Sequence, residues 1–154
     1  MKFLKYLAFC FVFFWCSVAV AAGITKKEVR DMMASIDRAI LAENISEFSN
    51  HLSENVILEI DYKSENSANT LTFGKEDYIS FIQQGLIRLD HYEIDRKITK
   101  INIISPKKVF VTSQLLEKAV AGNQRIIASS RERFTIERID GTLQITAYFS
   151  KTRL

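Results

Sequence analysis

The second half of this chain, from His91 onward, consists of four long segments with the pattern of β-strands. They span residues 91–105, 109–120, 124–139 and 142–152. The pair Asp140-Gly141 between the last two is a strong signal for a tight hairpin turn. Strands joined by such short turns pair as an antiparallel sheet, and the apolar face of that sheet needs a cover from other elements.

The first half predicts helices that can supply this cover. Thr25 and Glu28 have the spacing of a capping box. An apolar stripe at helical spacing follows, made by Val29, Met32, Met33, Ile36 and Ile40. We expect an amphipathic helix over residues 25–44 with this stripe in the core. Ser46 is placed to cap a second, shorter helix over residues 47–55.

A strand and a third helix complete the first half. Residues 56–64 alternate between apolar and polar side chains, which predicts a strand, and residues 71–73 predict a short returning strand that ends before Gly74. From Lys75 to Leu89 the apolar residues recur at helical spacing. Helices and a strand pair followed by long antiparallel strands define an α+β fold.

Residues 1–21 have the pattern of a secretory signal peptide. Lys2 and Lys5 open a short basic start, an apolar run follows, and Ala19-Val20-Ala21 fits an A-x-A cleavage site. Cleavage there leaves residues 22–154 as one exported domain, periplasmic or secreted.

Two alternatives to cleavage stay open. The apolar run approaches the length of a membrane span, so residues 6–22 are an alternative anchor in the inner membrane. Lipidation of Cys10 or Cys16 is the other alternative, although each cysteine follows a bulky aromatic residue where lipobox sequences carry a small one.

Cleavage after Ala21 would also change the composition. It removes both cysteines and leaves 154 minus 21, or 133, residues, enough for a core without disulfides. Two of the 21 Lys and Arg leave as well, so 19 basic residues stand against 18 acidic ones. That balance lacks the basic footprint of nucleic-acid binding, and we expect no nucleic-acid partner. With no spaced metal motif and no Gly-rich phosphate loop, we expect no metal and no cofactor.

The isoleucines of residues 91–105 change parity along the strand. Ile94 and Ile98 share one face, whereas Ile101 and Ile103 share the other. A β-bulge near Thr99 would explain the change.

The strand over residues 124–139 carries an unexpected carboxylate. The register that buries Phe134 and Ile136 turns Ser130 and Glu132 toward the same face, because strand side chains alternate. A carboxylate in a core-facing register indicates the wall of a pocket.

This order of elements resembles the nuclear transport factor 2-like (NTF2-like) superfamily, with its SnoaL-like, polyketide-cyclase-like and ketosteroid-isomerase-like branches. The resemblance rests on the segment FSNHLSENVILEI, where Leu52 to Val56 leads from a small helix into the first strand, and on FGKEDYISFI, where Gly74 precedes the third helix. It implies a cone: a strongly curved antiparallel sheet packed against three helices, with a pocket between them. The bulge near Thr99 suits such curvature. The domain over residues 22–154 is therefore expected to be NTF2-like.

The resemblance also limits the chemistry. Isomerase-like members carry a carboxylate base at the end of the first strand, and the matching position here is Ile60. Its neighbours Glu59 and Asp61 point to the opposite face, since a shift of one residue reverses the side chain. Ketosteroid-type isomerase activity is therefore not expected.

Glu132 is the best candidate for a catalytic residue, because burial in an apolar cleft raises the pKa of a carboxyl group toward the range of a general acid or base. The alternative is a structural ion pair with Arg125, Arg131, Arg133 or a helix lysine. The candidate ligand pocket consists of Ser130, Glu132, Tyr92, His91, Gln114 and Tyr148. His51 and His91 belong to no spaced metal motif.

Three functions follow from these observations. The first is an exported, non-catalytic domain that binds a small apolar or amphipathic ligand in the cone. The second is a cyclase- or isomerase-type enzyme that uses Glu132. The third is an envelope interaction module, because Arg131 and Arg133 take the convex face and family members commonly form homodimers through their sheets. The lack of a complete catalytic constellation favours the first.

Overall fold

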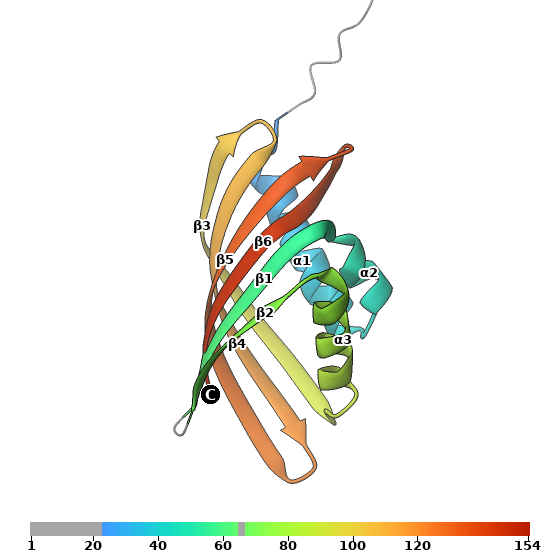
Figure 1. The fold of residues 1–154 in the computed structure, drawn as a ribbon, viewed down its shortest axis with the longest axis vertical. Helices are drawn as coiled ribbons and strands as arrows, with labels where there is room; N and C mark the ends of the chain where they lie inside the picture. Colours follow the sequence, from blue (N-terminus) through green and yellow to red (C-terminus); the bar gives the residue numbers. More distant parts are fainter. Residues whose placement is uncertain (1–22, 65–66) are drawn as a thin grey trace, which may run out of the picture.

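The computed structural model describes residues 23–64 and 67–154 as three helices and six strands (Figure 1). The helices are α1 (Lys26–Leu41), α2 (Ile45–Asn50) and α3 (Lys75–Leu86). The strands are β1 (Leu52–Lys63), β2 (Ala68–Phe73), β3 (His91–Ser105), β4 (Lys108–Ala121), β5 (Gln124–Ile139) and β6 (Thr142–Arg153). The segment expected to be a signal peptide, residues 1–21, lies outside the described residues. Within the described ranges, no helix has the length and apolar character of a membrane span.

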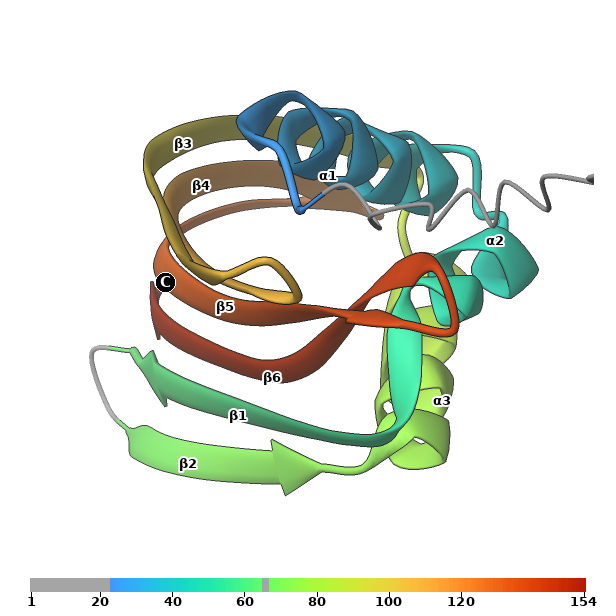
Figure 2. The same cartoon turned by 90° about the horizontal axis from the view of Figure 1, so that it is seen from above.

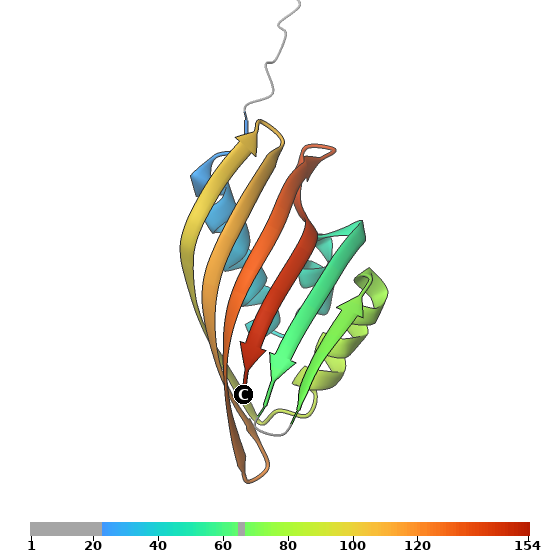
Figure 3. The same cartoon turned by 60° about the vertical axis from the view of Figure 1, so that its left-hand side comes forward.

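The strands form one strongly curved sheet in the order β2-β1-β6-β5-β4-β3, and the helices lie on its concave side (Figure 2). Neighbouring strands are antiparallel except β1 and β6, which run parallel. The α+β cone predicted from the sequence is confirmed, with a mixed rather than wholly antiparallel sheet. Figure 3 shows how β6, the last strand of the chain, lies between β1 and β5.

Helix α1 forms as its sequence predicts. The Thr25 hydroxyl accepts a hydrogen bond from the Glu28 backbone N–H at 3.2 Å, and a Glu28 carboxylate oxygen accepts one from the Thr25 N–H at 2.8 Å. These contacts satisfy two of the amide groups that a helix start leaves without partners. Val29, Met32, Met33 and Ile36 of the apolar stripe are buried in the core, and Ile40 is partly buried against it.

The second helix differs from its prediction. It is capped by Asn44, whose side-chain oxygen accepts from the Glu47 N–H at 3.2 Å, and it ends at Asn50. The expected cap at Ser46 and the extension to residue 55 are wrong. The reason is strand pairing: the Ile145 N–H donates to the His51 carbonyl at 2.8 Å, and Leu52, which is fully buried, already belongs to β1.

Two sequence signals set the shape of the sheet. The β3–β4 register shifts between Ile98 and Lys100, and the Thr99 hydroxyl donates to the Thr112 carbonyl at 3.0 Å, so the predicted bulge at Thr99 is confirmed. In the β5–β6 hairpin, Asp140 and Gly141 adopt φ values of 49° and 83°. Positive φ at both central residues is what a type I′ hairpin turn requires.

The core lies between helices α1 and α2 and the part of the concave face that these helices cover. Its most completely buried side chains include Met33, Leu58, Val109, Val111 and Ile136. The hairpin of β4 and β5 extends past the helices at the other end (Figure 1). The concave face is therefore sealed at one end and open at the other.

Candidate ligand pocket

The unsealed part of the concave face forms a cavity of about 660 Å³. This volume falls in the range of pockets that hold small molecules, about 300–1,000 Å³. Most of its lining is aliphatic or aromatic, from all three helices and all six strands. The exposed residues of its lining include Phe81 and Ile126 as well as Gln84 and Arg88, so the entrance is partly apolar and partly polar.

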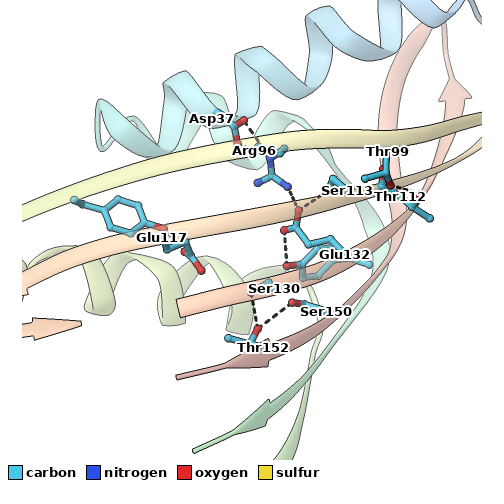
Figure 4. Close-up of polar contacts among 12 residues, drawn as sticks. Asp37, Arg96, Thr99, Thr112, Ser113, Glu117, Ser130, Glu132, Ser150 and Thr152 are labelled. Carbon is cyan, nitrogen blue, oxygen red and sulfur yellow. Dashed lines mark hydrogen bonds and ion pairs between the residues drawn. The ribbon is translucent and has the colours of Figure 1, made fainter. Parts of the chain in front are cut away.

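Glu132 of β5 lies in the wall of this cavity and is 2% exposed. One of its carboxylate oxygens, Oε2, accepts hydrogen bonds from the Arg96 guanidinium and, at 2.6 Å, from the Ser113 hydroxyl. The other, Oε1, accepts from the Tyr148 hydroxyl at 3.0 Å. Figure 4 shows Arg96, Ser113 and Glu132 converging from β3, β4 and β5, and Tyr148 belongs to β6. The carboxylate is thus held by three donors of the protein itself.

Arg96 connects this cluster to helix α1. Its Nε atom donates to both carboxylate oxygens of Asp37, at 2.8 and 3.1 Å, while its Nη1 atom donates to Glu132 (Figure 4). The Arg96 side chain is 7% exposed. Its guanidinium also lies 5.5 Å from the centre of the Phe134 ring, within cation–π distance. One buried cation therefore serves two carboxylates.

The pKa values of Arg96, Asp37 and Glu132 reflect this arrangement of one cation between two carboxylates. Burial raises the pKa of Glu132 and of Asp37 above their ordinary values, and the charge of Arg96 opposes both rises. Burial lowers the pKa of Arg96, but the two carboxylates outweigh this and hold it above its ordinary value. A single guanidinium cannot fully offset the lost hydration of two carboxylates, so both carboxyl groups bind protons more readily than in water.

A second carboxylate lines the cavity nearer its open end. The Tyr92 hydroxyl donates to Oε1 of Glu117. Burial, followed by the negative charge of Glu117, raises the pKa of Tyr92, which keeps the phenol protonated as a donor. Glu117 lies four residues from Ser113 on β4, so this polar contact is separate from the Glu132 cluster.

Three hydroxyl groups form another polar patch on β5 and β6. The Ser130 and Thr152 hydroxyls lie 2.9 Å apart, and Thr152 and Ser150 lie 3.1 Å apart (Figure 4). All three residues line the cavity. Hydroxyls both donate and accept, so this patch can bind polar atoms of either kind.

The structure brings together four of the six residues proposed for the pocket. Ser130, Glu132, Tyr92 and Tyr148 all line the cavity. Two do not. Gln114 is exposed and points to the opposite face from its neighbour Ser113, because side chains alternate along β4. His91 is exposed at the start of β3 and contacts Glu93 at 3.0 Å.

The partner of Glu132 is not among those expected. Arg125, Arg131 and Arg133 are exposed, and no helix lysine reaches Glu132; Arg96 pairs with it instead. Sequence reasoning missed Arg96, Asp37 and Glu117. A signal was present for two of them.

That signal is the alternation of each strand. Arg96 shares its parity with Tyr92, Ile94 and Ile98 on β3. Glu117 shares its parity with Val109, Val111, Ser113 and Leu115 on β4. Asp37 follows Ile36 at the edge of the α1 stripe and gave no comparable signal.

Comparisons with known proteins give likeness in structure alone. No family model matches the chain, and no curated protein is significantly similar in sequence. A solved structure from Novosphingobium aromaticivorans, named provisionally as a scytalone dehydratase, aligns with a TM-score of 0.68 and 14% identity over 83% of each chain. A ketosteroid isomerase-like protein from Erwinia carotovora atroseptica aligns with a TM-score of 0.63 and 14% identity, over 82% of this chain and 94% of that one. An NTF-2 like protein of unknown function from Shewanella oneidensis aligns with a TM-score of 0.60 and 12% identity, over 81% and 97%.

Proposed function

Because this chain has the nuclear transport factor 2-like fold, we propose that it is an exported, non-catalytic protein that holds a small apolar or amphipathic molecule in its cone. The observation that carries the proposal is the cavity of about 660 Å³, with its largely apolar lining. Burying an apolar ligand there is favourable by about 25 cal/mol for each Å² removed from water.

The state of Glu132 supports binding rather than catalysis. A general base needs a lone pair that reaches the substrate proton. Glu132 instead accepts from Arg96, Ser113 and Tyr148, so each of its two oxygens already has a donor from the protein. In this arrangement Glu132 fixes the position of the pocket wall.

The first strand supports the same conclusion. Ile60, at the position where the resemblance implies a carboxylate base, lines the cavity with an aliphatic side chain. Asp61, its neighbour, accepts a hydrogen bond from Thr70 at 2.6 Å and does not line the cavity. Two structural relatives are named for a dehydratase and an isomerase, so the fold is compatible with an enzyme. The side chains of Ile60 and Asp61 favour a ligand-binding protein over an isomerase.

Native mass spectrometry tests this proposal. The protein is purified gently from an exporting bacterial host and its native mass is compared with its denatured mass. We expect an additional small-molecule mass that disappears on denaturation. A protein that is purified without a ligand and binds none of a panel of apolar and amphipathic compounds would overturn the proposal. Chemical conversion of a bound compound would instead support a cyclase- or isomerase-type enzyme.

Export is also part of the proposal, and the denatured mass of the purified protein tests it. Cleavage after Ala21 predicts that the denatured mass corresponds to residues 22–154. A mass that includes residues 1–21, in a membrane fraction, would instead support the anchor through residues 6–22.

We also propose that two copies pair through the convex face of the sheet. Phe110, Leu116 and Ile127 lie on that face with 43%, 36% and 54% of their surface exposed, beside Arg131 and Arg133. Aromatic residues and arginine are enriched at protein interfaces. The same native spectrum reports the assembly: a dimer supports this proposal, and a monomer at micromolar concentration contradicts it.

A further inference from the structure

We propose that the ligand of this pocket carries a cationic amine, which binds at Glu117. The inference rests on the proposed function, since it names the class of molecule held in the cone. It comes from the balance of charges around the cavity.

The deep cation of the cavity is already neutralised. Arg96 donates to Asp37 through Nε and to Glu132 through Nη1, and its side chain is 7% exposed. A ligand carboxylate would have to displace one of these buried partners. Arg88, the other basic residue in the lining, is exposed on the turn after α3. The inner wall therefore offers an anion no uncommitted positive group among the described residues.

Glu117, in contrast, is an anionic group of the lining that can still accept a hydrogen bond. Its Oε1 atom accepts from the Tyr92 hydroxyl, whereas its Oε2 atom accepts no hydrogen bond from the described residues. Both residues line the cavity. A carboxylate has acceptor sites on both oxygens, so Glu117 keeps capacity for a further donor. A charged donor gives the stronger hydrogen bond there.

The end of helix α3 adds to this preference. Gln84, Gly85 and Leu86, from the last turn of α3, line the same cavity. The C-terminus of a helix carries a partial negative charge that favours cations. Apolar side chains, among them Ile94, Ala119 and Ile126, line the same wall and would contact the tail of such a molecule.

A matched series of probes tests the inference: decylamine, decanol and decanoate, each titrated into the purified protein near neutral pH. The three share one tail and differ in the charge of the head. We expect decylamine to bind about tenfold more tightly than decanoate, the scale of one hydrogen bond to a charged group. Equal or tighter binding of decanoate would overturn the inference.

Variants locate the site. Glu117→Gln should weaken decylamine about tenfold and leave decanol unchanged. The matched control is Glu93→Gln, which removes an exposed carboxylate from the opposite face of β3 and should change neither. Undiminished decylamine binding by Glu117→Gln would contradict the assignment to Glu117.

The two proposals can fail separately. Binding of decanol without preference for the amine would leave the apolar cone intact and refute the cationic ligand. Failure of all three probes would count against both. The comparison of probes on the unmodified protein stands even if Glu117→Gln does not fold.

Discussion

Arg96 of β3 and Glu132 of β5 form an ion pair across the intervening strand β4, with 7% and 1% of their side chains exposed. The Ser113 hydroxyl on β4 completes the bridge, and Asp37 extends it to helix α1. The cluster thus ties three strands and a helix together at the wall of the pocket. Its energetics rest on charge compensation, because removing one member of a buried ion pair leaves the other without a partner.

Replacing Arg96 by methionine should therefore be costly. Arg96→Met leaves Asp37 and Glu132 buried without their cation, and we expect a loss of about 3–5 kcal/mol in the free energy of unfolding near pH 7. Urea denaturation measures it. Arg30→Met, at an exposed position of α1, is the control and should change stability by less than about 0.5 kcal/mol. A loss below about 1 kcal/mol for Arg96→Met would contradict the compensating role of Arg96.

Glu132→Gln should cost much less than Arg96→Met. It leaves Arg96 paired with Asp37, one cation with one anion; the amide oxygen can still accept from Ser113, and the amide N–H can donate to the Tyr148 hydroxyl. We expect a loss of about 1.5 kcal/mol or less, together with altered ligand binding. Equal losses for the two variants would show that charge balance does not set the stability of the cluster.

The deficit of Arg96→Met should depend on pH. Arg96 opposes the rise in the pKa of Asp37 and Glu132, so its removal raises both pKa values further above those of the unfolded chain. A raised folded-state pKa contributes stability below the unfolded pKa and loses it as the pH rises through the folded one. Unfolding free energies should therefore differ most between variant and wild type near pH 7, and the gap should narrow toward about pH 5. A constant gap would mean that neither carboxyl group takes up a proton.

Glu28 should show the reverse dependence. Hydrogen bonds from Arg138 and Thr25 lower the pKa of Glu28 from 4.5 to about 2. A lowered folded-state pKa contributes stability above the unfolded pKa and loses it as the pH falls through the folded one. The stability gap between wild type and Glu28→Gln should therefore close as the pH falls from 4.5 toward 2. Thermal unfolding across this range measures it, and a gap that widens in acid would contradict the capping contacts.

Core truncation tests the packing under α1. Met33 and Ile136 are 1% and 0% exposed, and replacing either by alanine should cost about 2–5 kcal/mol. Ile87→Ala, at a site 72% exposed on the turn after α3, is the matched control and should cost less than about 0.5 kcal/mol. Similar losses at Ile136 and Ile87 would contradict the assignment of Ile136 to the core.

Local patterns predicted most of the fold. The capping box, the Thr99 bulge and the Asp140-Gly141 turn each depend on neighbouring residues, so the sequence contains their cause. The end of α2 does not depend on neighbouring residues. It is set by pairing of β1 with β6, about ninety residues away, which the sequence near His51 does not encode.

The candidate site divides in the same way. Alternation along β5 predicted that Glu132 and Ser130 share the core-facing side, since it is a property of one strand. The ion pair with Arg96 required knowing that β3 and β5 flank β4 on one curved face. Asp37 enters only through the packing of α1 on that face, a tertiary relationship that no local pattern contains.

The position of β6 has a consequence for how the molecule is made. Among the described strands, the hairpin of β1 and β2 meets the rest of the sheet only through β6, which pairs with β1 across about ninety residues of sequence. During translation the edge of β1 that faces β6 therefore has no partner until β6 has emerged. Contacts between such distant segments close slowly, because the entropy of the loop must be lost before the pairing is gained. The six-stranded cone is thus completed only once β6 has been made, well after β1 itself.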